Sequence, residues 1–568
     1  MEEFTQQGPK LPKNLYQSDN LLQDYLSSFL PKEIFQAIEP DLNQLGKRAS
    51  DDILKMAQDA ETHLPQHIPY DEWGNRIDKI QVAQGWEELN KVSAEEGLIS
   101  IAYERKYGEH SRTYHFAKNF LFSPSSAVYS CPLAMTDGAA KLIEIYGDDN
   151  LKQRAFKHLT SRNPTEFWTS GQWMTEKSGG SDVGRTETIA KLIDGEYHLY
   201  GLKWFTSAVT APMAMTLARI QDKNGKTTPG GKGLSLFYLE KTKEDGSNNN
   251  IEILRLKDKL GTRALPTAEL RLDGSRAFLV GEEGKGVKTI ATLFNITRIH
   301  NALNAASFSR RMLTLAYDYA PKRIAFKKTL NQHPLHLQTL WELEVEAQAA
   351  FHLLFFSARL LGKTESGEDK NEHGLAVLRL ITPVLKLYTA KQNINITSEV
   401  IESFGGIGYL EDSGFGKWLR DGQTLSIWEG TTNVLALDLL RSIEKDHSFG
   451  PWSEEICSLI ENINNENLLK SKEYVMSEFK DLCTFTQNFN QLDRNCTEAI
   501  ARKFAYSIAR VTMACLMLDF SQRMTGNKRE LFYRDSAQSF CSLKLNLTEN
   551  FNLKSWKMAE QHLFNQDS

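Results

Sequence analysis

The sequence predicts an α+β protein in which a central β domain is flanked by helical regions and followed by an additional helical domain. Apolar residues follow helical spacing up to about residue 165, and short alternating runs between turn clusters replace it over residues 166–280. Helical spacing returns at about residue 286, and 568 residues are too many for one hydrophobic core. We therefore expect domains at residues 1–165, 166–284, 285–445 and 446–568.

The first two domains differ in the spacing of their apolar residues. In the N-terminal domain, residues 85–107 have helical spacing, and Pro132 opens another helical run that ends near Tyr146. In the β domain, residues 234–239 alternate in polarity, and clusters such as Pro229-Gly230-Gly231 mark turns. This second pattern predicts an antiparallel barrel or sandwich.

The last two domains are predicted to be helical. Residues 340–361 are apolar on most of a helix circumference, so this helix is expected in a bundle centre or a subunit interface. The terminal domain contains a near-heptad stripe formed by Ile500, Phe504, Ile508, Val511, Cys515 and Leu518. Basic residues are also frequent in this domain, namely Arg494, Arg502, Lys503, Arg510, Arg523, Lys528, Arg529 and Arg534. They form either a solvated helix face or a basic patch, and we favour the solvated face.

Composition and charge exclude several classes of protein. The chain is 41% hydrophobic and 24% charged, and its net charge of −5 argues against strong attraction to nucleic acid or anionic lipid. No apolar run reaches the ~20 residues that span a bilayer. The N-terminus, acidic at Glu2 and Glu3, lacks the apolar centre of a signal peptide. We expect a cytoplasmic protein without a membrane span.

Cysteine and histidine spacing predicts no metal site. The six cysteines contain no CxxC pair, so we expect reduced structural thiols. His63 and His67 are separated by Pro65, which is unfavourable for a helical ligand pair, and no HExxH sequence occurs.

Two loops of the β domain suit a flat or anionic ligand. Met174 and Thr175 begin a segment that continues through Gly179-Gly180 to Ser181, and such a loop can approach a ligand closely. Farther on, Trp204 can stack on a heterocycle while Thr206 or Ser207 bonds to its edge. Taken singly, the glycine-containing loop could equally well be a β-turn, and Trp204 could equally well be a core tryptophan in a strand.

The glycine-rich segments of the helical part do not fit nucleotide motifs. Gly284-Lys285-Gly286 lacks the spacing of a phosphate-binding loop. Gly405-Gly406-Ile407-Gly408 ends a helix instead of following a strand, so it is no dinucleotide fingerprint. Glu429, taken alone beside Gly430, would usually be a solvated loop acid.

Together and in this order, the segments resemble the acyl-CoA dehydrogenase family up to about residue 440. The most specific are MTEKSGGSDV, KWFTS, KDKLGTR, GEEGKGV, RIAF, GGIGY and WEGTTN. The AidB-type branch is more similar still, on the evidence of Asn14-Leu15-Tyr16, Tyr70-Asp71, Gly74-Asn75-Arg76, Cys131-Pro132 and Trp428. The resemblance implies the family fold, with an N-terminal helical domain, a β domain, a helical bundle and, in this branch, an extra C-terminal helical domain.

The resemblance also implies FAD, bound between the β domain and the bundle. Met174 and Thr175 would line the isoalloxazine, Ser181 the pyrophosphate or acyl-CoA, and Trp204 with Thr206 or Ser207 the ring. Arg323 would reach the FAD pyrophosphate of a neighbouring subunit, in a homotetramer. The remaining expected contacts, on the adenine side and around the base, are Phe326, Gly405, Gly406, Ile427, Trp428, Gly430, Thr431 and Asn433.

Glu429 stands where most of the family has the base that removes the α-proton of an acyl-CoA. Other members place this base directly before an arginine, where this chain has Thr297-Arg298, and threonine cannot serve. Lys327 replaces the usual glycine after Phe326, and Trp428 the commoner tyrosine, which leaves the acyl chain undefined.

Three functions remain open. The first, which we favour, is an acyl-CoA dehydrogenase that passes electrons to an electron-transfer flavoprotein. The second is an AidB-like flavoprotein of alkylation stress with weak dehydrogenase activity, which would bind DNA through a basic C-terminal face. The third is a fatty-acyl-binding sensor that retains FAD.

Overall fold

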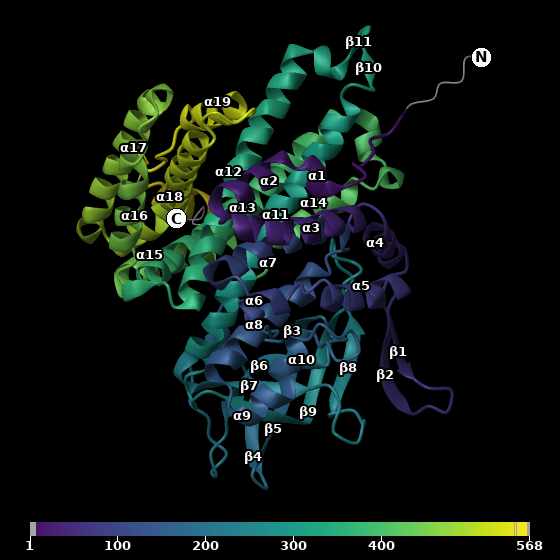
Figure 1. Ribbon diagram of the computed structural model, residues 1–568. Helices are drawn as coiled ribbons and strands as arrows, with labels where there is room; N and C mark the ends of the chain where they lie inside the picture. The colour runs from purple at the N-terminus through teal and green to yellow at the C-terminus, as the bar shows by residue number, and fades with distance from the viewer. Residues whose placement is uncertain (1–6, 550, 553, 565–568) are drawn as a thin grey trace.

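The computed structural model describes residues 7–549, 551–552 and 554–564, and these form four successive parts (Figure 1). Residues 1–6, on which the expectation of a chain without a targeting signal partly depends, lie outside the described residues. The first part consists mainly of helices: α1 (Leu15–Ser18), α2 (Asn20–Phe29), α3 (Lys32–Arg48), α4 (Asp52–Thr62), α5 (Gln84–Glu95), α6 (Ser100–Glu104), α7 (Ser111–Phe122), α8 (Ser130–Tyr146), α9 (Asp149–Leu151) and α10 (Lys157–Leu159). A hairpin of β1 (Gln66–Tyr70) and β2 (Arg76–Gln81) projects from it.

The second part is a closed sheet. Its strands are β3 (Ser170–Gln172), β4 (Ile189–Ile193), β5 (Glu196–Ser207), β6 (Met213–Ile220), β7 (Leu234–Glu240), β8 (Ile251–Leu256) and β9 (Thr267–Val280). The pairings β6–β4–β5–β9–β7 return to β6, so the sheet is a barrel. Most pairs are antiparallel as expected, whereas β3–β6 and β4–β6 are parallel.

The barrel is buried on two sides at β6. Met213, Met215 and Leu217 pack in the same apolar cluster as Leu142 of α8 and Leu293 of the bundle. Intervening residues such as Ala214 and Ala218 belong to the cluster inside the barrel. Alternate residues of a strand face opposite sides, so one strand serves both cores.

The third part is a bundle of long helices. Its elements are α11 (Gly286–Tyr319), β10 (Ile324–Ala325), β11 (Lys328–Thr329), α12 (Pro334–Ser366), α13 (His373–Ser403), α14 (Gly416–Leu425) and α15 (Thr432–Asp446). α11 packs on α8 as well as on α12 and α13, so it joins the bundle to the N-terminal part. α12 is buried at most positions between Leu343 and Leu361, as its apolar circumference predicted.

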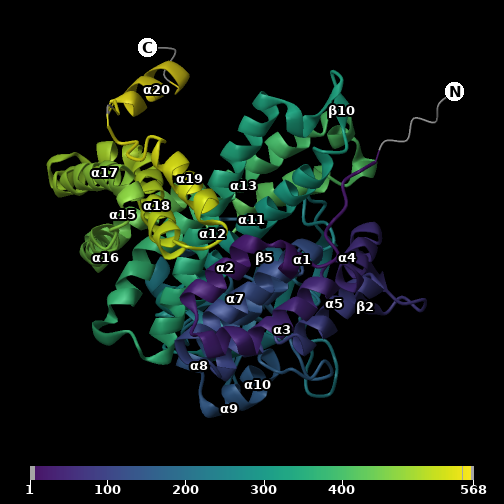
Figure 2. The ribbon, with the colours of Figure 1, turned by 45° about the horizontal axis from the view of Figure 1, so that its top comes forward.

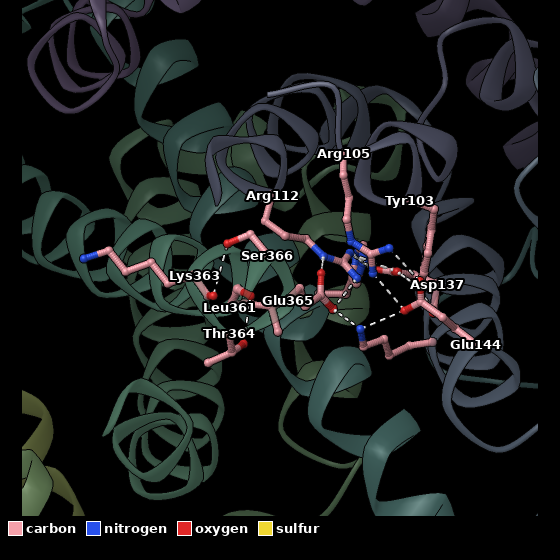
Figure 3. A network of polar contacts seen from close by, with 12 residues as sticks. Tyr103, Arg105, Arg112, Asp137, Glu144, Leu361, Lys363, Thr364, Glu365 and Ser366 are labelled. Carbon is pink, nitrogen blue, oxygen red and sulfur yellow. Dashed lines mark hydrogen bonds and ion pairs between the residues drawn. The ribbon is translucent and has the colours of Figure 1, made fainter. Parts of the chain in front are cut away.

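A buried ionic network fixes the bundle to the N-terminal helices. The Arg112 guanidinium donates to Asp137 at 2.8 Å and to Glu365 of α12 at 2.6 Å (Figure 3). The Asp137 carboxylate also bonds to His300 Nε2 of α11 at 2.8 Å. Because removing one partner of a buried ion pair costs roughly 3–5 kcal/mol, the network holds α7, α8, α11 and α12 in one arrangement.

The fourth part packs against the bundle and α2 (Figure 2). It contains α16 (Phe449–Glu461), α17 (Leu469–Gln487), α18 (Arg494–Arg523), α19 (Glu530–Cys541) and α20 (Ser555–Phe564). All six members of the predicted stripe on α18 are fully buried. Within the described residues, α18 alone is long and apolar enough to cross a membrane, and 89% of the relevant window is buried inside the protein. The predicted α+β fold class with an extra helical domain is confirmed.

Candidate active site

Glu429 lies in the loop between α14 and α15, in an unusual backbone conformation. Its φ is 57° and that of Gly430 is 103°, so both residues are left-handed. Glycine adopts this region freely, whereas for glutamate it costs on the order of 1 kcal/mol or more. The conformation is one reason to read Glu429 as a functional residue and not as a loop acid.

Two distant segments bond to the Glu429 carboxylate. The Thr297 hydroxyl of α11 donates to Oε2 at 2.7 Å. The Gln172 amide of β3 donates to Oε1 at 3.3 Å, while the amide oxygen of Gln172 is buried without a hydrogen-bond partner among the described residues. The carboxylate therefore lies where the barrel meets the bundle.

Opposing influences act on the pKa of Glu429. Withdrawal from water is the largest and raises the pKa above the ordinary glutamate value. The Thr297 hydrogen bond, the Arg298 charge and the Gln172 hydrogen bond act in the opposite direction but do not cancel it. A carboxylate with a raised pKa is a stronger base once ionised, which is the property a proton-abstracting group requires.

The two loops predicted to line the isoalloxazine lie side by side. The Thr175 carbonyl accepts a hydrogen bond of 2.9 Å from the Trp204 backbone N–H. Next to them, Lys203 and Glu176 form a fully buried ion pair of 2.7 Å that joins the loop to β5. Met174 is buried in the cluster between barrel and helices, and Ser181 is exposed at the turn.

The residues around Trp204 have distinct surroundings. Lys257 Nζ lies 3.2 Å from the centroid of the indole ring. Thr206 is fully buried and donates to the Ala268 carbonyl at 2.7 Å, which commits its proton within the sheet. Ser207 is half-buried, with its hydroxyl 3.2 Å from that of Thr267, so it is the better-placed donor of the predicted pair.

A separate pocket of about 460 Å³ is lined by Arg323, predicted for the pyrophosphate, and by Gly405 and Gly406, predicted for the adenine side. A methyl group built on either glycine would meet no described atom within 4 Å, so both face open space. Phe326, predicted for the same pocket, does not line it, and its side chain is 93% exposed on the β10–β11 turn.

The residues flanking Glu429 are divided between core and solvent. Trp428 donates from Nε1 to Asn301 Oδ1 at 3.2 Å, which anchors the indole against α11. Ile427 is 61% exposed, and Thr431 and Asn433 are exposed at the start of α15. The side chains of these three residues are therefore accessible to a ligand or to a second subunit.

Several residues near Glu429 were missed by the sequence analysis. Gln172 precedes the recognised loop, and Lys386 and Asn301 lie in long helices where a single polar residue gives no local signal. Lys259 belongs to the recognised KDKLGTR segment but was predicted to have no role of its own; it is half-buried, and withdrawal from water lowers its pKa to about 8. Thr297 was identified only as unable to act as base, and its bond to the base emerges from the fold.

One buried group has the composition of a metal site. His115, Asp137 and His300 place possible ligand atoms within 4.8 Å of one another. However, Asp137 is already engaged by the Arg112 guanidinium at 2.8 Å and by the Tyr103 hydroxyl. A cation added there would face that positive charge in a low-dielectric interior, so we assign no metal.

Models of known families match along the chain. The adaptive response protein AidB N-terminal domain matches residues 6–163, and the middle and C-terminal domains of acyl-CoA dehydrogenase match 171–275 and 284–444. The acyl-CoA dehydrogenase 11 C-terminal domain-like model matches 449–567.

Individual proteins show the same similarity. Acyl-CoA dehydrogenase family member 11 of Caenorhabditis elegans is 44% identical over 91% of this chain and 85% of its own. The crystal structure of C. elegans ACDH-11 with C11-CoA superposes with a TM-score of 0.94, at 41% identity over 100% of this chain and 98% of that one. The AidB protein of Escherichia coli is 31% identical over 78% of this chain and 80% of its own. An acyl-CoA dehydrogenase from Bacillus anthracis complexed with FAD shares the fold, with a TM-score of 0.71 at 18% identity over 92% of this chain and 87% of that one. The chain belongs to the acyl-CoA dehydrogenase family, whose members bind FAD.

Proposed function

We propose that this protein is an FAD-dependent acyl-CoA dehydrogenase that removes the α-proton of an acyl-CoA through Glu429. The observation that carries the proposal is the Glu429 carboxylate itself. It has a raised pKa, accepts the Thr297 hydroxyl at 2.7 Å and meets β3 at the junction of barrel and bundle. Glu429 ionised would take the proton from the α-carbon, and Thr297 and Gln172 would keep its two oxygens oriented.

Residues of two regions fit FAD. Met174, Thr175, Trp204 and Ser207 would lie along the ring, and the open glycines beside Arg323 suit an adenosine diphosphate moiety that needs close backbone approach and a cation. When bound, FAD supplies the acceptor for the hydride that leaves the β-carbon.

The test is anaerobic mixing of the yellow holoprotein with acyl-CoAs of graded length. We expect the flavin absorbance to bleach, and the acyl length that bleaches fastest to identify the substrate. Glu429→Gln should retain the yellow colour and lose at least about 100-fold in bleaching rate, because general-base catalysis contributes that much or more. A holoprotein that no acyl-CoA bleaches, or a Glu429→Gln variant as fast as wild type, would contradict the proposal.

The DNA-binding alternative is less well supported. Arg529 pairs with Asp24 of α2 at 2.6 Å, and Arg494 with Glu444 and Glu498 at 2.6 Å. Arg523 pairs with Asp519 at 2.8 Å, whereas Arg510 donates to the Tyr388 hydroxyl, which fixes its guanidinium against α13 without neutralising the charge. Basic groups that are neutralised within the chain have less charge to offer to phosphates. DNA retardation that weakens steeply with salt would revive this reading.

The remaining expectations are proposals that depend on the same assignment. We propose a homotetramer, because the β10–β11 hairpin lies at the end of the bundle away from the barrel (Figure 1) and Phe326 on its turn is almost fully exposed. An electron-transfer flavoprotein is the proposed electron acceptor, and the cytoplasm the proposed location.

A further inference from the structure

Two cationic side chains donate hydrogen bonds to the backbone of the turn that contains the proposed base. Lys386 of α13 donates from Nζ to the Gly430 carbonyl at 2.6 Å. Arg298 of α11 donates from Nε to the Glu429 carbonyl at 3.3 Å and pairs with Asp438 of α15 at 2.8 Å. Two helices, α13 and α11, thus donate to two consecutive carbonyl groups of a left-handed turn, and α15 is joined to them through Asp438.

Lys386 differs from Arg298 in its surroundings. Asp438, which is shared with Arg379, balances the charge of Arg298. Lys386 is fully buried, and its ammonium group donates to a backbone carbonyl. The charged groups that act on it are Glu429, Arg298 and Lys391. A buried lysine without a bonded carboxylate is costly, and such a cost is retained where the group serves a function.

We propose that Lys386 is a positioning residue for Glu429: by holding the Gly430 carbonyl it maintains the left-handed turn and keeps the carboxylate aimed at the substrate α-carbon. This inference rests on the proposed function of Glu429 as the base. Without the lysine, the turn can relax toward ordinary backbone geometry, because the energy that offsets its strain is lost. The carboxylate would then move, although Thr297 and Gln172 remain.

The charge of Lys386 also acts on the base. Glu429 is the neighbour that raises the pKa of Lys386, but burial dominates and lowers that pKa to about 7. In return, the Lys386 charge lowers the pKa of Glu429. Loss of the cation therefore raises the pKa of Glu429, so that a higher pH is needed to ionise the base.

The experiment compares Lys386→Met, Lys386→Gln and Lys386→Arg in the full-length holoprotein. For Lys386→Met we expect flavin reduction by acyl-CoA to be slower by on the order of 100-fold, as for small misplacements of a catalytic group, with an acid limb at higher pH. Lys386→Arg should restore much of the rate, and Lys386→Gln, which retains a donor without the charge, should fall between. Lys363→Met, the loss of an exposed lysine on α12 that acts on neither Lys386 nor Glu429, should behave as wild type.

A crystal structure of Lys386→Met provides a readout that is independent of turnover. We expect a changed backbone at Glu429 and Gly430 with FAD content retained. Wild-type rate and acid limb in Lys386→Met, or an unchanged turn, would overturn the inference. If Met prevents folding, Lys386→Gln decides by rate and acid limb alone, because its amide can still hold the carbonyl. A wild-type holoprotein that acyl-CoA cannot reduce would instead refute the proposed function.

Discussion

The Glu429 turn and the Arg323 pocket differ in how much of each this chain completes. At the turn, both carboxylate oxygens and both carbonyls of residues 429–430 accept hydrogen bonds from β3, α11 and α13. At the pocket, Gly405 and Gly406 face open space, and neighbouring Tyr409 is 92% exposed. The Glu429 turn is therefore pre-organised within one chain, whereas the pocket has surface left for a ligand and a second subunit.

The largest effect is expected for Arg323→Ala, which tests the difference between the turn and the pocket. If Arg323 binds the FAD pyrophosphate, the variant loses charge-assisted bonds worth roughly 2–3 kcal/mol, about 100-fold in FAD affinity. The rate of flavin reduction at saturating FAD should stay within about twofold of wild type, because the Glu429 turn is untouched. Apoprotein titration with FAD and stopped-flow reduction measure the two quantities.

Arg271→Ala is the matched control for that experiment, since Arg271 lies on the barrel with a half-exposed side chain paired to Glu252. It should bind FAD like wild type. An Arg323→Ala variant with unchanged FAD affinity, or with a reduction rate that falls as far as the affinity, would abolish the distinction between the two regions.

The next largest effect is expected for Phe326→Ser. If its ring is covered by another subunit, the variant loses about 2 kcal/mol of apolar burial at each contact, or roughly 30-fold in association. Sedimentation velocity over a dilution series should show smaller species at higher concentration than in wild type. Leu192→Ser, at a position 59% exposed on β4, should leave association unchanged; equal effects of both variants would argue against an interface at Phe326.

The sequence predicted the buried helices more fully than it predicted the surroundings of Glu429. The stripe from Ile500 to Leu518 and the apolar circumference of α12 identified buried helices, because periodicity reports burial directly. The recognised motifs predicted functional roles for Glu429 and Trp204, which stay predictions. Gln172 and Lys386 could not be found, since they lie 257 and 43 positions from Glu429 and only the packing of β3 and α13 brings them to the turn.

The exposure of Phe326 was unpredictable for a related reason. Its motif implies a contact with FAD, but Phe326 and Lys327, both with positive φ, form the tight turn of the β10–β11 hairpin, where the Phe326 ring is exposed and does not line the pocket of Arg323. A motif marks residues that make contacts in the assembled protein, whereas the structure of one chain contains only the contacts that are made within that chain.

Thr297→Val is expected to have the smallest effect. It measures how far the hydrogen bond from Thr297 prepares the Glu429 carboxylate for its proposed role. Valine keeps the shape but removes the donor to Glu429 Oε2, and a hydrogen bond to a charged group contributes roughly 1.5 kcal/mol or more, about tenfold in rate near neutral pH. Because this bond stabilises the ionised carboxylate, its loss raises the pKa of Glu429 further. The base acts only above its pKa, so the acid limb of flavin reduction should shift to higher pH, with the rate partly recovered under alkaline conditions. Thr297→Ser should resemble wild type, and a Thr297→Val profile that falls equally at every pH would mean that Thr297 shapes the site without acting on the charge of the base.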